Sequence, residues 1–404
     1  MVYTETKTIA WFDRIKASIK QIGGGFFLIG ASLVALRWNE ANYIQTKESL
    51  EELGSNIVAV SADAVDVANN GLPIHIQGSV QTTEIIGDEQ FFLMAPTGAL
   101  RVMRTVEMYQ RVETTKTETT DNAGGSQTEK MTYEYTKEWR SDVIDSSSFK
   151  QPQTPSNPGS MPYAAFEKTV SSATVGAFVL SPDQIQQVPG GVKLMPTDDV
   201  LVALDFVTQN RAIVRDGYLM IGQTSKPGLT PTIGDIRISW EYVPATDVSI
   251  IAQQNNDRLQ EFQTNHGKSF FLLHEGRKSA DVMIADEQSS NTMIAWLIRI
   301  VGIVFCIIGF NMIFSILPTI ASILPLFGRI VGAGISLVAG VLGFSLSFIM
   351  IAIAWVRFRP LIGIGLLIVG VGAGAWLWWH KKNAPGITKD EEPKQADEEV
   401  VETK

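Results

Sequence analysis

Residues 293–317 of the chain read MIAWLIRIVGIVFCIIGFNMIFSIL, and this stretch decides the class of fold. Arg299 and Asn311 are the two strongly polar residues in it. A helix that crosses the hydrocarbon core of a bilayer needs about 20 mostly apolar residues. The stretch exceeds that length, and we expect a transmembrane helix over residues 292–317.

Three other apolar runs predict that the chain crosses the membrane four times. Residues 18–38 form the first run, and residues 330–356 and 361–380 follow the run quoted above. Runs of this length and number exclude a soluble protein. The first run has the residue order of a cleaved signal peptide, but no typical cleavage site follows it. We therefore interpret residues 18–38 as an uncleaved anchor.

Basic residues at the ends of the outer spans predict the orientation in the membrane. They are Arg14, Lys16, Lys20, Lys381 and Lys382. An even number of spans places both termini on one side, and these residues mark that side as cytoplasmic. Residues 1–17 are then a cytoplasmic segment and residues 381–404 an acidic, disordered cytoplasmic tail. Arg357 and Arg359 fall on the opposite side in this scheme, a conflict that a re-entrant third segment would remove.

The polar stretch between the first two spans, residues 39–291, predicts one large domain in the periplasm or lumen. Period-two alternation marks its strands, as in IRISWEYV at residues 236–243. Helix is expected at residues 44–53 and after Ser181, where Ser-Pro-Asp resembles the start of a helix. The fold class that follows is a polytopic α-helical membrane protein that carries a large α+β, mainly antiparallel-β, extracytoplasmic domain.

Two segments inside this domain predict a long hairpin. VEMYQRVET (residues 106–114) and YTKEWRSDVI (residues 135–144) both alternate with period two. The residues between them are polar and contain two glycines, which is typical of a hairpin tip. We expect a paired hairpin with a mobile tip over residues 116–130.

The sequence predicts no catalytic, cofactor-binding or metal site. The four histidines have no ligand spacing with one another or with Cys306, the single cysteine. No phosphate loop of the form GxxxxGK[ST] and no GxSxG nucleophile elbow occurs. The net charge of -9, without a basic cluster, argues against nucleic acid as a partner. Nothing points to a small-molecule substrate.

Carboxylates along the hairpin are the only candidates for general acid–base chemistry. They are Glu107, Glu113, Glu134, Glu138 and Asp142. Because they alternate with Arg111, Lys137 and Arg140, we favour cross-strand ion pairs.

Small and polar residues in the predicted membrane helices are the candidates for helix packing. Small residues recur at a spacing of four in three groups: Gly332, Ser336 and Gly340; Gly343 and Ser347; Gly370 and Gly374. This spacing lets helices approach closely, within one bundle or between subunits. Arg299 lies near a helix start, and we expect it to extend to the interface rather than pair. For Asn311 we expect a hydrogen bond to a neighbouring helix rather than a place in a conducting path.

Several blocks of the sequence, in order, resemble the LUMA family, also called the transmembrane protein 43 family. The blocks include Trp38-Asn39-Glu40, VEMYQRVET, YTKEWRSDVIDSSSF (residues 135–149), GAFVLSPDQI (residues 176–185), GDIRISWEYV (residues 234–243) and NTMIAWLIRIVG (residues 291–302). The framework residues that carry the resemblance are Trp38, Asn39, Glu40, Glu107, Tyr109, Glu138, Trp139, Arg140, Asp235 and Arg237. Relatives often continue the first block with glycine and arginine, where this chain has Ala41 and Asn42.

The resemblance implies four spans, a large lumenal or extracytoplasmic domain, self-association and a scaffolding role without enzymatic activity. In animals that role lies at the endoplasmic reticulum or nuclear envelope, beside emerin and lamins; a bacterial inner membrane is the other candidate location. The expected partners are the bilayer, further copies of the chain and other membrane proteins. The main alternative function is a channel or transporter subunit built on the last three helices, and a membrane-tethered hydrolase is a third.

Overall fold

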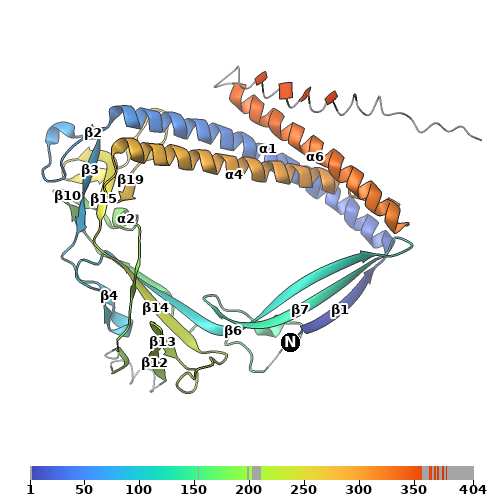
Figure 1. Ribbon diagram of the computed structural model, residues 1–404, viewed down its shortest axis with the longest axis horizontal. Helices are drawn as coiled ribbons and strands as arrows, with labels where there is room; N and C mark the ends of the chain where they lie inside the picture. Colours follow the sequence, from blue (N-terminus) through green and yellow to red (C-terminus); the bar gives the residue numbers. More distant parts are fainter. Residues whose placement is uncertain are drawn as a thin grey trace, which may run out of the picture.

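The computed structural model describes residues 2–152, 154–197, 200–202 and 211–356, together with residues 364–365, 368–369, 371–372, 375–376 and 379. The predicted span 361–380 lies mostly outside these residues, and the predicted tail 381–404 lies wholly outside them. A helical arm and a β-sheet arm extend from one β-rich region and meet again at the far end of the molecule (Figure 1).

Three long helices form the helical arm. They are α1 (Trp11–Asn56), α4 (Ala280–Phe314) and α6 (Pro325–Val356), with the short α5 (Ile316–Ala321) between the last two. Each of the three is long and apolar enough to cross a membrane. The chain is therefore an integral membrane protein by the length and composition of these helices.

The boundaries expected between spans and domain fall inside these helices. Helix α1 continues past Trp38 as far as Asn56, and α4 already begins at Ala280. Leu50 and Leu53 of α1 pack on Met283 of α4 and Ile251 of the β-rich region in a small apolar cluster. Apolar residues at helical spacing thus continue α1 and α4 beyond the apolar runs expected to cross the membrane, and they pack these helix ends against the sheets.

Two sheets make up most of the β-rich region. Within the described residues the larger has eight strands: β1 (Val2–Ile9), β7 (Gln127–Arg140), β6 (Arg101–Asp121), β14 (Ile236–Val243), β13 (Tyr218–Ile221) and β12 (Ala212–Arg215) in spatial order, with β8 (Phe166–Thr169) on β6 and β11 (Val192–Leu194) on β14. The smaller has seven: β19 (Leu272–Glu275), β15 (Asp247–Asn255), β16 (Arg258–Gln260), β10 (Phe178–Leu180), β9 (Ala173–Val175), β3 (Pro73–Gln81) and β2 (Val58–Ala59). Almost all neighbours are antiparallel, which confirms the expected mainly antiparallel character.

Short elements complete the region. Two-stranded pairs are formed by β4 (Gly87–Asp88) with β5 (Leu93–Met94) and by β17 (Phe262–Gln263) with β18 (Ser269–Phe270). Short helical turns are η1 (Val67–Asn69), η2 (Glu89–Phe91), η3 (Ser146–Ser148) and α2 (Pro182–Ile185). Helix α2 starts after Ser181, as expected, with Ser181 and Gln184 forming a capping box.

A large apolar core joins strands of both sheets and contains Trp240 of β14, the largest of the fully buried side chains among the described residues. A buried ion pair joins Arg104 Nη1 to Asp88 Oδ2 at 2.7 Å, and Trp240 Nε1 donates to the same carboxylate oxygen at 2.8 Å. Arg104 also lies over the ring of Phe91, 4.8 Å from its centre. The charge pair is therefore neutralised and hydrogen-bonded, as burial requires.

The β6–β7 hairpin is longer and more ordered than the sequence suggested. Its ladder runs to the pair Asp121↔Gln127, so that only the turn between these residues remains of the expected mobile tip over residues 116–130. Strand β1, which sequence analysis treated as a cytoplasmic segment, pairs with β7 from Val2↔Glu134 to Ile9↔Gln127. Two features explain why the strands continue to the tip. The alternating residues include many threonines, which favour strands because they are β-branched, and a third strand, β1, stabilises the hairpin beyond what two strands achieve alone.

Candidate functional site

An ion pair between two of the long helices is the candidate functional site. Glu40 of α1 is fully buried and Arg299 of α4 is 8% exposed. Arg299 donates from Nε to Glu40 Oε1 at 2.6 Å and from Nη2 to Oε2 at 2.7 Å. The two helices run antiparallel along most of their length, which brings the end of one apolar run level with the start of the other. The geometry is the bidentate pairing in which arginine binds a carboxylate most strongly.

The third helix and a neighbouring amide complete the polar contacts. Trp355 of α6 donates its indole N–H to Glu40 Oε2. Asn39 donates to the backbone oxygen of Ala295 at 3.1 Å and also contacts Glu40. The carboxylate of Glu40 thus links α1, α4 and α6.

Aromatic rings surround the guanidinium. Its central carbon lies 4.9 Å from the ring centre of Trp296, 5.3 Å from that of Tyr43 and 6.0 Å from that of Trp355. Such faces attract a cation, most strongly where water is excluded. We name Glu40, Arg299, Tyr43, Trp296 and Trp355 the polar lock.

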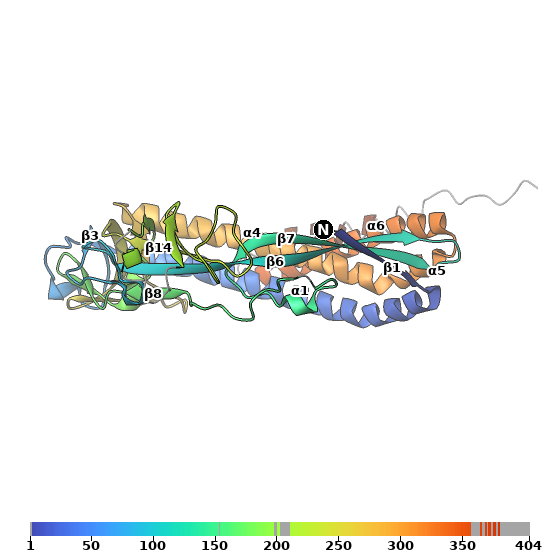
Figure 2. The ribbon, with the colours of Figure 1, turned by 90° about the horizontal axis from the view of Figure 1, so that it is seen from below.

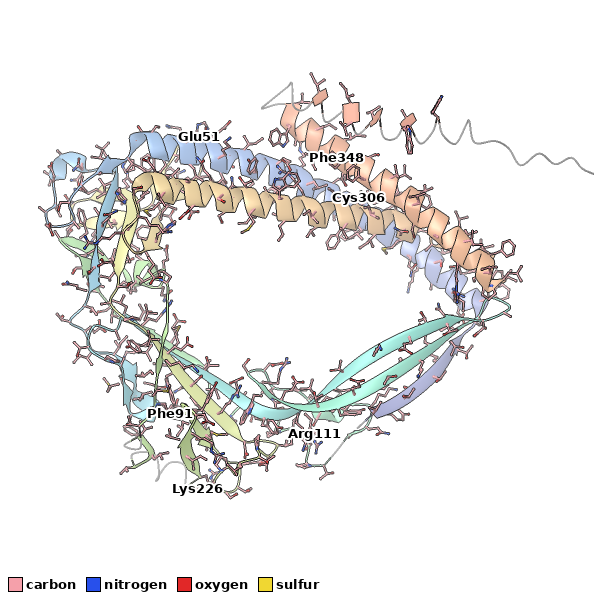
Figure 3. The ribbon with its side chains drawn as sticks, in the orientation of Figure 1. Glu51, Phe91, Arg111, Lys226, Cys306 and Phe348 are labelled. Carbon is pink, nitrogen blue, oxygen red and sulfur yellow. The ribbon has the colours of Figure 1, made fainter. Side chains whose placement is uncertain are left out.

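A cavity of about 290 Å³ lies against the polar lock. It is lined by Tyr43, Trp296, Arg299, Ile303, Phe348, Ile351 and Trp355. Phe348 stands where α6 crosses the α1–α4 pair (Figure 3). The walls are mainly aromatic and aliphatic, and the one charged group is already neutralised by Glu40, so the cavity suits hydrocarbon better than an ion.

The polar lock differs from what the sequence suggested for its arginine. Arg299 was expected to extend to the membrane interface; instead it is buried and paired, because Glu40 lies opposite it and offers two acceptors. Asn311 was expected to bond a neighbouring helix; instead it donates to Ile307 O, one turn earlier in its own helix, at 3.0 Å. Short amide side chains reach that carbonyl easily.

The small residues of α6 divide into two groups along one face of the helix. A Cβ added to Gly343 would lie 2.8 Å from the backbone of Ile307 in α4, and Ser347 is fully buried. Ser336 is exposed, and a Cβ on Gly340 would meet no atom within 4 Å. Gly332 has only Pro318 nearby, at 3.6 Å. The other two candidates, Gly370 and Gly374, lie outside the described residues.

The closest helix contact involves glycines that sequence analysis noted only in part. Gly25, in the run Gly23-Gly24-Gly25, faces Gly309 of α4: a Cβ on Gly25 would lie 2.6 Å from Gly309 O, and one on Gly309 would lie 2.9 Å from Gly25 O. Gly302 likewise receives Leu36. The seven-residue spacing of Gly302 and Gly309 places them on one helix face and was the signal available in the sequence.

Most of the remaining framework residues gather where β6, β7 and β14 meet. Arg237 pairs with Glu107 through two bonds of 2.6 and 2.9 Å, and lies over Trp139, 4.8 Å from its ring centre. Tyr109 packs on Trp139 with 5.2 Å between ring centres. Asp235 accepts from the backbone of Thr232 at 2.7 Å. Trp38 is exposed, whereas the neighbouring Asn39 is buried.

The hairpin carboxylates are held in ion pairs and backbone contacts. Asp142 bonds Arg140 at 3.1 Å, and this hydrogen bond holds the pKa of Asp142 below its usual value. Glu138 lies 4.0 Å from Arg140, and Glu113 accepts from the backbone of Lys150 at 2.7 Å. No group of three or more metal-ligating side chains occurs among the described residues. Both ion pairs of Arg140 join residues of its own segment, so they are not the cross-strand pairs favoured from the sequence. A cross-strand ion pair of a hairpin carboxylate joins Glu107 of β6 to Arg237 of β14.

Comparisons with known proteins agree on one family. A family model described as Transmembrane protein 43 matches residues 108–360. Transmembrane protein 43 of Homo sapiens is 30% identical over 396 residues, which cover 91% of this chain and 94% of the human protein. The mouse protein is 30% identical over 85% of the chain and 86% of its own length, and the homolog of Drosophila melanogaster is 23% identical over 87% and 92%. No solved structure matches the chain significantly.

Proposed function

The chain belongs to the transmembrane protein 43 family, and from that premise we propose that it is an integral membrane scaffold that self-associates and organises other membrane proteins around its large β-rich region. The proposal assigns the chain no catalytic reaction. The observation that carries it is the part of the α6 small-residue face that α4 does not cover. In the described part of the chain, Ser336 is exposed, a Cβ on Gly340 would meet no atom within 4 Å, and Gly332 is approached by Pro318 of α5.

The small-residue face belongs to α6, a helix that is otherwise strongly apolar. Small residues without bulky neighbours let a second helix approach its backbone, and in lipid such packing drives association because no hydrophobic effect acts between helices. Further along the same face, Gly343 and Ser347 already receive α4 in this way. The uncovered residues therefore offer a second copy the surface that α4 uses within the chain.

The test is the oligomeric state in mild detergent, measured by native mass spectrometry or single-particle imaging. Gly340→Leu and Ser336→Leu should shift the protein toward monomer. Gly334→Leu is the matched control, because Gly334 also has no atom within 4 Å of an added Cβ but lies on the opposite side of α6. A wild-type chain that stays monomeric at high concentration would overturn the proposal. Oligomers that neither substitution affects would show that a surface other than this face of α6 mediates self-association.

A channel or transporter subunit is the second candidate. It is favoured by two buried hydroxyls of α6, on Ser345 and Ser347, which have no hydrogen-bond partner among the described residues. Against it, the charge of Arg299 is neutralised and Asn311 is bonded within its own helix. Flux of ions or solutes through liposomes containing the wild-type chain, abolished by Asn311→Leu, would establish the channel. Absence of flux with the wild-type chain would exclude this second function.

A further inference from the structure

The polar lock lies at the level where the apolar runs of the three long helices end. Glu40 comes just after the run of α1, Arg299 lies near the start of the run of α4, and Trp355 is the next-to-last residue of α6. Helix α6 lies along α1 and α4 in the half of the molecule remote from β3 (Figure 2). Tryptophan and tyrosine concentrate at the boundary between hydrocarbon and headgroups. The other two members of the polar lock, Tyr43 and Trp296, are of these types, and the polar lock therefore marks that boundary.

The cavity beside the polar lock continues onto the apolar surface of α4. Its walls include the stacked rings of Tyr43 and Trp355, with 6.3 Å between ring centres and 24° between ring planes. Trp296 is a wall residue that is also 58% exposed. About one turn further along α4, the side chain of Ile300 is 58% exposed as well. A hydrocarbon chain that lies on this surface can therefore enter the cavity from the lipid.

Arg299 keeps one nitrogen for a further hydrogen bond. Its Nε and Nη2 both donate to Glu40, and within the described part of the chain Nη1 has no acceptor. The Arg299 side chain is 9% exposed and lines the cavity, and Nη1 is not among the fully enclosed atoms that lack a partner. Because Glu40 already neutralises the guanidinium, the free N–H suits a neutral acceptor, such as an ester carbonyl, better than an anion.

The volume of the cavity selects among apolar molecules. A cavity of about 150 Å³ lined by aliphatic and aromatic side chains binds benzene, so that about 290 Å³ holds on the order of a dozen carbon atoms. This is enough for a segment of a fatty acyl chain and too little for a sterol. The ester groups of a glycerolipid lie at the boundary between hydrocarbon and headgroups, which is the level of the polar lock.

We propose that the cavity binds one acyl chain of a membrane glycerolipid, and that Arg299 Nη1 donates a hydrogen bond to the ester carbonyl of that chain. The chain lies among Ile303, Phe348 and Ile351, and the headgroup stays outside the cavity. The site is separate from the surface proposed for self-association, because Gly340 lies two turns along α6 from Phe348.

Photo-crosslinking of the full-length protein in mild detergent tests the site. The probe is a phosphatidylcholine that carries a diazirine in one acyl chain. After illumination, peptide mass spectrometry should place the adduct on α4 near Ile303 and on α6 near Phe348. Ile303→Trp fills the cavity and should abolish this adduct. Ile308→Trp is the matched control, because Ile308 is 42% exposed and points away from the cavity on the same helix, and it should leave the adduct unchanged.

Competition on the wild-type protein tests the two parts of the ligand without any substitution. Unlabelled diacyl phosphatidylcholine should displace the probe. The dialkyl ether analogue has no ester carbonyl and should need about a tenfold higher concentration, because it loses a hydrogen bond from a charged group. Diacyl phosphatidylglycerol should compete as well as phosphatidylcholine, since the anionic headgroup lies outside the cavity. Cholesterol at the same concentration should leave the probe bound.

Four results would overturn the proposal. An adduct spread over exposed apolar positions such as Phe27 and Leu337, without concentration at the cavity, would show that lipid only coats the helices. Equal adducts in Ile303→Trp and Ile308→Trp would show that the cavity is not the site. Equal competition by the ether analogue would remove the carbonyl from the ligand of Arg299. Displacement by cholesterol as efficient as that by the diacyl lipid would exclude an acyl chain as the specific occupant.

Discussion

Arg299 and Glu40 lie 259 positions apart in the sequence and share two hydrogen bonds in the interior of the helical arm. Neither charge has another counter-ion within reach among the described residues. The stability of the arm therefore depends on both partners together, whatever the chain assembles with.

Removing one partner should expose this dependence. Glu40→Gln leaves a buried guanidinium without its carboxylate, and we expect the free energy of unfolding to fall by about 3–5 kcal/mol. Thermal unfolding in detergent measures the effect. Glu51→Gln is the control on the same helix, since the exposed Glu51 lies 3.7 Å from Lys47 and its loss should cost below about 0.5 kcal/mol. Equal losses in the two variants would contradict the role of the polar lock.

The contact between Gly25 and Gly309 predicts a steric effect. Gly309→Val places two methyl groups against the α1 backbone and should destabilise the helix pair by about 1–3 kcal/mol. Gly23→Val is the matched control, because a Cβ there meets no atom within 4 Å. Melting temperatures of the purified variants decide the comparison, and a Gly309→Val protein as stable as Gly23→Val would contradict the close approach.

Contacts that we name the clasp join the tip of the β6–β7 hairpin to the start of α1, and the start of α1 to α5. Arg14 pairs with Asp121 at 3.0 Å and donates to Gly125 O at 2.6 Å, and Trp11 Nε1 donates to Thr319 O at 2.9 Å.

The clasp predicts a local effect without global unfolding. Arg14→Ala removes the ion pair with Asp121 and the bond to Gly125 O, worth roughly 1.5–3 kcal/mol for charged hydrogen bonds. Hydrogen exchange at residues 119–129 should accelerate about tenfold or more, while the β14 amides keep their protection. Lys16→Ala is the control, since Lys16 is exposed and its ion pair, at 3.6 Å, is with Asp13 of the same helix. Unchanged exchange at the tip in Arg14→Ala would show that the arms are joined by other means.

One histidine of the β-rich region predicts a pH dependence. Burial lowers the pKa of His75, against a smaller opposing effect of its hydrogen bond to Lys278 O. Because the folded pKa lies below the unfolded value of 6.5, the folded state resists protonation. Its stability contribution is complete above pH 6.5 and is lost as the pH falls through the folded pKa. The melting temperature of His75→Gln should decline less on acidification than that of the wild type, and parallel curves would refute the assignment.

The sequence predicted the helices and strands better than it predicted which of them contact one another. Strand β14 occupies the residues whose alternation defined it, and the first three apolar runs lie largely in α1, α4 and α6, while the fourth lies mostly outside the described residues. Glu40 was singled out by its family block and Arg299 by its cost in lipid, but nothing local to either residue shows that the helices place them together. That contact depends on the antiparallel packing of α1 and α4, which Gly25 and Gly309 let approach closely at positions further along both helices.

The position of the amino-terminal segment was missed for a different reason. VYTETKTI alternates as a strand does, yet its basic neighbours and the apolar run after it directed the interpretation to membrane orientation. Pairing with β7 spans more than a hundred residues, and the register has no signature in either strand alone. The ordered hairpin tip follows from the same long-range partner.

The clasp also sets an order of events in time. Trp11 and its partner Thr319 are 308 positions apart, so Trp11 leaves the ribosome well before the residue that it bonds. At roughly 5–20 residues per second, synthesis separates the two by some tens of seconds. During that interval Trp11 lacks its partner, whereas β1 and Arg14 already have theirs in residues 121–134. A nascent chain arrested before Thr319 should therefore protect residues 2–9 from protease while the Trp11 indole has no hydrogen bond to Thr319 O.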